Sequence, residues 1–188
     1  MPPEYHPGLR DRLRRRGRLP LLERMHALLQ PEGLRLLDLG GGTGVTTVEF
    51  GRGSRELVVL EPSPPKVERG RKAHAPVTFV SGVAEEIPFE PGRFDRVVSL
   101  ISFHHFSDGA KACREAWRVL TPGGRFLIYD FSCGPPPARV LAFFERTFHH
   151  RSFRFLTAAE LEGVVRGAGF REVRQESFRS GTIVMGQR

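Results

Sequence analysis

The chain has 188 residues, of which 39% are hydrophobic and 27% are charged, and its formal net charge at pH 7 is +8. This length suffices for one α/β domain with a substantial core but not for two, and no run approaches the roughly 18 apolar residues of a membrane span. Glu23 and Arg24 interrupt the apolar stretch that follows the first arginines, so we expect no signal peptide and a soluble, cytoplasmic protein.

The excess positive charge is confined to the two ends of the chain. Residues 1–30 and residues 139–188 each carry a net charge of +4, whereas residues 31–138 are neutral. Arginine outnumbers lysine 26 to 3, which genome composition or heat adaptation explains as well as function does. The basic ends leave two interpretations open, a solvated surface and a contact with RNA or another anion.

Residues 1–30 are predicted to form a basic N-terminal arm followed by a helix. Arginines, prolines and glycines dominate the first 18 residues, which show little apolar periodicity. Apolar residues then recur at helical spacing until Pro31 ends the segment. The main domain is predicted to occupy residues 31–188.

The most informative stretch is residues 34–44, an apolar run of strand length that ends in Asp38 and a cluster of glycines. This order predicts a buried strand that enters a tight turn before a short helix at residues 45–50. Glycine is needed in such a turn because the backbone must reverse sharply and approach a ligand, and a Cβ would obstruct both. The glycines of the turn are Gly40, Gly41, Gly42 and Gly44.

The spacing of these glycines argues against a dinucleotide site. A dinucleotide fingerprint requires glycine or alanine three residues after its second glycine, and Val45 stands there instead. Asp38 would repel a pyrophosphate but suits a ligand that carries an ammonium group. We therefore favour an adenosine joined to an amino acid over a nicotinamide dinucleotide.

At this point the chain resembles the class I S-adenosylmethionine-dependent methyltransferases. The first motif of that family is an acid followed by Gly-x-Gly-x-Gly, matched here by Asp38, Gly40, Gly42 and Gly44. The resemblance implies S-adenosyl-L-methionine as cofactor and S-adenosyl-L-homocysteine as product. It also implies that residues 31–188 form a Rossmann-like α/β domain, whose seven-stranded sheet is mostly parallel with an antiparallel C-terminal edge strand and has helices on both faces.

A second strand is predicted at residues 56–60, and it ends at Glu61. An acid about 20 residues beyond the glycine turn is placed to accept hydrogen bonds from both ribose hydroxyls of an adenosine. Glu61 and the adjacent Pro62 are therefore predicted to bind the cofactor. Ser63 is predicted to cap a helix that accommodates two prolines in its first turn.

The segment after a third predicted strand, residues 77–80, resembles the family's adenine-binding segment, Gly-Asp-Ala-Glu-x-Leu-Pro-Phe. Val83, Ala84 and Glu85 stand at its Asp-Ala-Glu positions and are predicted to lie at the cofactor. Val83 replaces the aspartate that accepts a hydrogen bond from the adenine amino group, so only the backbone around Ala84 is expected to contact the edge of the base. Lys66 replaces an apolar residue. These departures are expected to weaken cofactor binding by the worth of one hydrogen bond, roughly 1 kcal/mol.

A fourth strand at residues 94–100 matches the family pattern Phe-Asp-x-Val-x-Ser, which assigns Ser99 to the cofactor site. Ligands of open parallel sheets bind beyond the carboxyl ends of the strands, which places Ser102, His104 and His105 beside the reacting methyl group. Either histidine is a candidate general base, and His105 is preferred. The alternative is that the pair caps and packs against the next helix. We predict no metal site, because a cluster of four histidines would require two distant segments to meet.

The later part of the chain is predicted to complete the sheet. A covering helix at residues 110–120 is followed by a Thr-Pro-Gly-Gly turn at residues 121–124 and by a strand at residues 125–130. A capping box opens a helix at Thr157, and two final strands pair in antiparallel fashion. Neither cysteine stands at a metal-type spacing, so both are expected to be reduced.

Residues 131–156 are a candidate substrate-pocket segment, because phenylalanines and arginines alternate in it after a proline-rich linker. An aromatic and basic lining favours a flat, partly anionic substrate, although ordinary core packing explains the phenylalanines equally well. The prolines and aromatic residues alone leave these two interpretations open.

The motifs together predict methyl transfer by in-line displacement to a small acceptor, aromatic or anionic, as in the quinone-biosynthesis branch that the chain resembles. Holding donor and acceptor in near-attack geometry is enough to supply most of the rate. Two alternatives from other classes stay open. One is an RNA or protein methyltransferase that uses the basic ends, and the other is a non-catalytic S-adenosylmethionine-binding protein.

Overall fold

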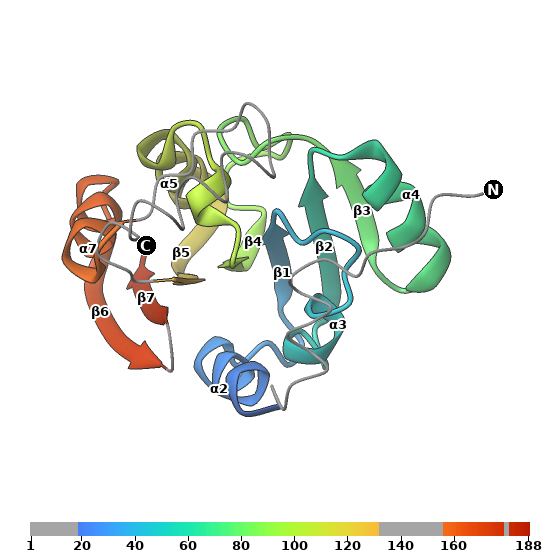
Figure 1. Ribbon diagram of the computed structural model, residues 1–188, viewed down its shortest axis with the longest axis horizontal. Coiled ribbons are helices and arrows are strands. Elements are labelled where there is room, and N and C mark those ends of the chain that lie inside the picture. Colours follow the sequence, from blue (N-terminus) through green and yellow to red (C-terminus); the bar gives the residue numbers. More distant parts are fainter. Residues whose placement is uncertain (1–18, 132–155, 179–180) are drawn as a thin grey trace, which may run out of the picture.

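A central sheet with helices on both faces forms the body of the molecule (Figure 1). The structure, a computed structural model, describes residues 19–131, 156–178 and 181–188. The basic arm before residue 19 and nearly all of the candidate substrate-pocket segment lie outside these described residues.

Seven strands form the sheet in the order β3-β2-β1-β4-β5-β7-β6. The strands are β1 (Arg35–Leu39), β2 (Glu56–Glu61), β3 (Thr78–Ser81), β4 (Phe94–Leu100), β5 (Leu120–Asp130), β6 (Arg171–Phe178) and β7 (Gly181–Gln187). The first five pair in parallel, whereas β7 is antiparallel to both β5 and β6. The predicted Rossmann-like sheet is confirmed, and its antiparallel strand β7 lies one place inside the edge strand β6.

The helices divide between the two faces of this sheet (Figure 1). One face is covered by α5 (Gly109–Val119) and α7 (Ala158–Gly167). The other face is covered by α2 (Leu19–Leu29), α3 (Thr47–Phe50) and α4 (Pro64–Ala73). A short 3₁₀ helix, η1 (Phe103–His105), follows β4.

Alternate strand residues supply the two cores. Leu37 and Leu39 of β1 join the core beneath α5 and α7, whereas Leu36 joins the core beneath α2. Because both faces are covered, the strand reads as a continuous apolar run rather than as an alternating one. Met25 and Leu29 of α2 are fully buried in the second core, so the predicted N-terminal helix packs directly against the sheet.

The predicted turn at residues 121–124 lies inside β5. Phe94 of β4 pairs with Leu120, and Arg96 then pairs with Arg125, so the intervening residues of β5 bulge from the sheet. Gly123 in this bulge has a φ of +78°, which glycine adopts without strain. The turn residues were recognised correctly, but strand pairing resumes on both sides of them.

The two predicted helix caps have different outcomes. The capping box is confirmed, since Thr157 Oγ1 accepts from the Glu160 amide at 3.3 Å and Glu160 accepts from the Thr157 amide at 2.8 Å. Ser63 is the N-cap residue of α4 and the two prolines follow in its first turn, as predicted, but the Ser63 side chain makes no capping hydrogen bond. Two prolines remove the first amide donors of α4, and the Lys66 amide donates to the Ser63 carbonyl instead.

An ion pair fixes the start of β1 to the start of β4. Asp95 Oδ2 accepts hydrogen bonds from the amide and from Nε of Arg35, at 2.9 and 3.0 Å, and Asp95 Oδ1 accepts from an Arg35 terminal nitrogen at 3.0 Å. The hydrogen bonds from the Arg35 side chain lower the pKa of Asp95 to about 2, although burial opposes the shift. This pair lies at the end of the sheet where the parallel strands begin.

We expect Asp95→Asn to lower the free energy of unfolding at pH 7 by up to roughly 2 kcal/mol, and by about half as much at pH 3. The folded pKa lies below the unfolded value, so the stabilisation is complete above about pH 5 and is lost as the pH falls toward 2. Urea unfolding at both pH values measures the difference, with exposed Glu68→Gln on α4 as the control. An equal loss at pH 7 and pH 3 would contradict the role of the ionised carboxylate.

Candidate functional site

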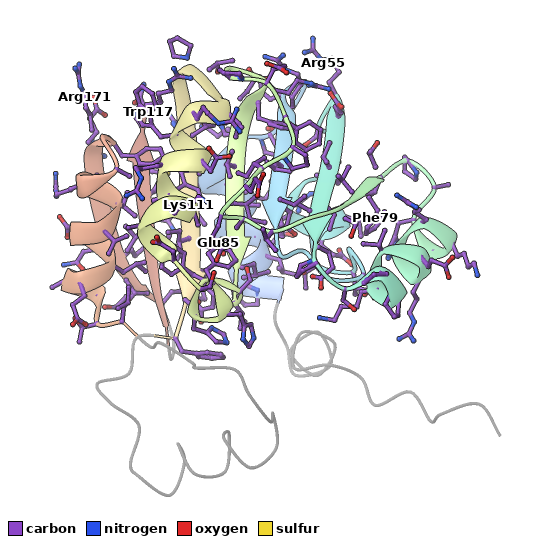
Figure 2. All side chains as sticks on the ribbon, turned by 90° about the horizontal axis from the view of Figure 1, so that it is seen from above. Arg55, Phe79, Glu85, Lys111, Trp117 and Arg171 are labelled. Carbon is purple, nitrogen blue, oxygen red and sulfur yellow. The ribbon has the colours of Figure 1, made fainter. Side chains whose placement is uncertain are left out.

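The predicted site residues converge on one edge of the sheet. The glycine turn follows β1, Glu61 ends β2, residues 83–85 follow β3, and η1 follows β4. The strands are parallel, so their carboxyl ends meet at the same edge. Figure 2 marks the opposite edge by Arg55 and Arg171, which lie where β2 and β6 begin.

Side chains from distant parts of the sequence pack against the glycine turn. Gly40 has a φ of +70°, and a Cβ there would lie 2.8 Å from Cβ of Ser102. Gly44 has a φ of +76°, and a Cβ there would lie 2.7 Å from Cζ of Phe79. Figure 2 shows Phe79 between β3 and α4. The glycines are therefore required by the protein's own packing as well as by any ligand.

Asp38 lies beneath the turn and is fully buried. Its Oδ2 accepts a hydrogen bond of 2.6 Å from the Thr47 hydroxyl, and a Cβ added to Gly41 would lie 2.6 Å from the same oxygen. The carboxylate thus supports the turn from inside, and its contact with the cofactor stays a prediction. A buried negative charge still attracts a cationic group across the turn.

Glu61 joins the glycine turn to the start of α4. Its buried carboxylate accepts from the Gly42 amide at 3.0 Å and from the Ser63 amide at 3.2 Å. Nζ of Lys66 lies 3.3 Å from Oε1 of Glu61, and the Lys66 side chain is 56% exposed. Each carboxylate oxygen accepts two hydrogen bonds, so Glu61 keeps acceptor capacity for ligand hydroxyls.

Glu85 connects the segment after β3 to the segment after η1. Its Oε1 accepts from the amide and the hydroxyl of Ser107, at 2.6 and 2.9 Å, and from the Asp108 amide at 3.2 Å. Figure 2 shows Glu85 beside α5. The carboxylate of this predicted cofactor residue is therefore engaged in holding two loops together.

Two residues of α5, Glu115 and Arg118, hold the same loop in place. Glu115 accepts from the Ile87 amide at 2.9 Å, and Arg118 donates to the carbonyls of Ile87 and Phe89 at 2.8 and 2.7 Å. Glu115 and Arg118 also pair with each other at 2.7 Å. The segment that carries Val83 and Ala84 is thus anchored along its length, and Ala84 itself is buried.

The predicted site residue Ser99 lies behind the turn and is fully buried. Its hydroxyl is 2.8 Å from that of Ser102, which donates to the Leu39 carbonyl at 2.8 Å. Between them Ile101 has a φ of +50°, which is strained for a β-branched residue. Ser102, which was predicted to lie beside the reacting methyl group, therefore links the end of β1 to the turn from β4 into η1.

The two histidines of η1 have different environments. His104 is buried, its Nδ1 lies 2.7 Å from Asp130 Oδ1, and its amide donates to Asp130 Oδ2 at 2.9 Å. His105 is exposed, and its ring lies 4.0 Å from the His104 ring, measured between centroids. Asp130, at the end of β5, was missed by the sequence reasoning although an acid at a strand end is a usable signal.

Three further observations concern metal ligands, membrane spans and a cysteine among the described residues. No group of three histidine, cysteine or acidic side chains within them could hold a metal ion. None of the helices they form is long and apolar enough to cross a membrane. Burial raises the pKa of the Cys113 thiol to about 12, so this cysteine is not a thiolate nucleophile.

Comparisons with known proteins decide the family. A family model described as a methyltransferase domain matches residues 37–128. The ubiquinone/menaquinone biosynthesis C-methyltransferase UbiE of Vibrio parahaemolyticus is 30% identical over 182 residues, which cover 81% of this chain and 70% of that protein. The chain belongs to the class I S-adenosylmethionine-dependent methyltransferases. S-Adenosylmethionine is accordingly the cofactor of this methyltransferase.

Two further similarities support the assignment. The demethylmenaquinone methyltransferase of Thermus thermophilus is 36% identical over 129 residues, which cover 65% of this methyltransferase and 57% of that protein. The crystal structure of YcgJ from Bacillus subtilis superposes with a TM-score of 0.73 at 26% identity, over 83% of this chain and 70% of that one. Among curated relatives the chain spans between 40% and 72% of the relative's length.

We expect Asp130→Asn to loosen η1, because an amide offers one acceptor oxygen where the carboxylate offers two. Hydrogen exchange at the amides of His104 and Phe131, both bound by Asp130, should accelerate about tenfold or more. Asp108→Asn is the matched control, since asparagine caps a helix as well as aspartate does. Unchanged exchange at both amides would show that Asp130 does not hold η1.

Proposed function

We propose that this methyltransferase modifies a small aromatic acceptor that carries an ionisable hydroxyl, such as a hydroquinone. The observation that carries the proposal is the exposed imidazole of His105, held beside the buried His104–Asp130 pair at the edge of the sheet that also carries Glu61. The names of relatives support this acceptor class, since they include a ubiquinone/menaquinone C-methyltransferase and a phytyl-hydroquinone methyltransferase.

The backbone of the glycine turn and the carboxylate of Glu61 suit the cofactor. The carboxylate of Glu61 has acceptor capacity for the two ribose hydroxyls, and Pro62 lies beside it. Glycines at positions 40, 41, 42 and 44 let the backbone approach the amino-acid part, with Asp38 and Ser99 supporting the turn from behind. Val83 and Ala84 lie on the adenine side, where Glu85 holds the loop in place.

The cofactor supplies an electrophilic methyl group on a positively charged sulfur. The protein's part is to hold the acceptor in line with it and to take the proton of the acceptor hydroxyl on the His105 ring. His104 and Asp130 are positioning residues in this scheme, because they fix η1 rather than reach the acceptor. The candidate pocket segment at residues 131–156 and the cytoplasmic location stay predictions.

Glu61→Gln is expected to weaken S-adenosylhomocysteine binding about tenfold or more, because a neutral amide binds the ribose hydroxyls less strongly than a carboxylate does. Isothermal titration calorimetry measures the affinity, and the thermal transition shows whether the variant is folded. Glu68→Gln, an exposed change on α4, is the matched control. Equal affinities of Glu61→Gln and wild type would remove Glu61 from the cofactor site.

His105→Ala is expected to lower methyl transfer about a hundredfold while S-adenosylhomocysteine affinity stays unchanged. The assay follows a labelled methyl group from S-adenosylmethionine into a lysate of the source organism that is separated into small-molecule, RNA and protein fractions. We expect the label in the small-molecule fraction, and its loss with His105→Ala supports the role of the imidazole as base. A variant as active as wild type would contradict that role.

The same assay distinguishes the other two classes of function. Label in RNA or protein would overturn the small-molecule proposal and favour a macromolecular acceptor bound by the basic ends. A steep salt dependence of RNA binding would support an RNA acceptor, because contacts with phosphates release counterions. No label in any fraction, with S-adenosylhomocysteine bound, would favour a protein that binds the cofactor without catalysis.

A further inference from the structure

The segment after β3 is the neighbour of Glu61 on the outer side of the sheet. Ser81 pairs with Glu61, and the Gly82 amide donates to the Glu61 carbonyl at 3.3 Å. Because β3 lies directly beside β2, an adenosine whose ribose is held by Glu61 can extend its base over this segment. Val83 follows Gly82, and its side chain is 44% exposed.

An exposed valine at this position is unusual within the fold. Among the residues that the structure describes, Val83 is the one large hydrophobic side chain that is exposed. Apolar surface of this kind gains free energy when a ring system covers it. The Val83 side chain has no acceptor, so it is unable to bind the amino group of an adenine.

Two of the three nearby acids, Glu61 and Glu85, are hydrogen-bonded to other groups. Glu61 is bonded to the amides of Gly42 and Ser63, and Glu85 is bonded to Ser107 and Asp108. Glu86 remains as the acid that competes for the amino group, because it is exposed in the turn that begins at Val83.

A backbone hydrogen bond closes this turn. The Val83 carbonyl accepts from the Glu86 amide at 3.2 Å. Downstream, Glu115 and Arg118 of α5 hold Ile87 and Phe89 in place. A rearrangement that brings a different side chain to the position of Val83 would break these contacts.

We propose that Val83 is a specificity-determining residue that packs on the adenine ring, so that no protein group accepts a hydrogen bond from the exocyclic amino group. The protein then accepts adenosyl ligands that carry substituents on that nitrogen. A polar group built to bind the amino nitrogen would reject such ligands strongly, whereas an apolar contact rejects them weakly. The inference rests on the proposed placement of the cofactor and is independent of the methyl acceptor.

The test compares S-adenosylhomocysteine with its N6,N6-dimethyl derivative, in which the amino group has no hydrogen to donate. Calorimetry on the wild-type protein should give dissociation constants within about threefold of each other. Val83→Asp should bind S-adenosylhomocysteine at least as tightly as wild type and should prefer it over the dimethyl compound by about tenfold. Thr78→Asp, which adds the same charge at an exposed position of β3, should keep the wild-type ratio of the two dissociation constants.

Each other outcome would overturn the inference in a distinct way. A wild-type preference of tenfold or more for S-adenosylhomocysteine would mean that the protein binds the amino group. The Glu86→Gln variant would then show whether Glu86 accepts that hydrogen bond. A Val83→Asp variant that melts like wild type and yet shows no new preference would place Val83 away from the base. Failure of both compounds to bind the wild type would overturn the proposed cofactor placement as well.

Discussion

The hydrogen bonds of the Glu61 carboxylate are the constraint on which the cofactor side of this molecule depends. Gly42 lies in the glycine turn, and Ser63 lies at the start of α4. Oε2 of Glu61 accepts a hydrogen bond from the Gly42 amide, and Oε1 accepts one from the Ser63 amide. A buried carboxylate must be hydrogen-bonded, because a charge without partners is costly to bury. The requirement therefore fixes the glycine turn and the helix relative to β2 before any ligand binds.

Packing against the glycine turn extends this constraint across the sheet. Ser102 and Phe79 occupy the space that side chains at Gly40 and Gly44 would fill. Ser102 also binds the Leu39 carbonyl and the Ser99 hydroxyl, so the end of β1 and the strained turn after β4 hold each other. A site made in this way is pre-organised, because the same contacts that stabilise the fold set the positions of its ligand-facing groups.

The sequence predicted the parts of the site whose signal is local. The glycine turn and Glu61 stand in an order and at a spacing that are visible within about 25 residues. The anchors were not predictable in this way, because Asp130 meets His104 only through the pairing of β4 with β5, and Glu115 meets Ile87 only through the packing of α5. The side-chain hydrogen bond of the Ser63 cap is absent for a local reason, since Pro65 has no amide hydrogen and the Lys66 amide donates to the Ser63 carbonyl.

The two halves of the site are held by different kinds of contact, and this difference bears on how the protein divides its tasks. On the proposed cofactor side, charged side chains of α5 bind backbone groups of the loop after β3, as Glu115 and Arg118 do. On the acceptor side, the buried pair of His104 and Asp130 holds a single turn, and the exposed His105 extends from it. In the proposed arrangement the donor position stays constant while the acceptor side can change its shape, because a different acceptor requires changes around η1 and none at Glu61.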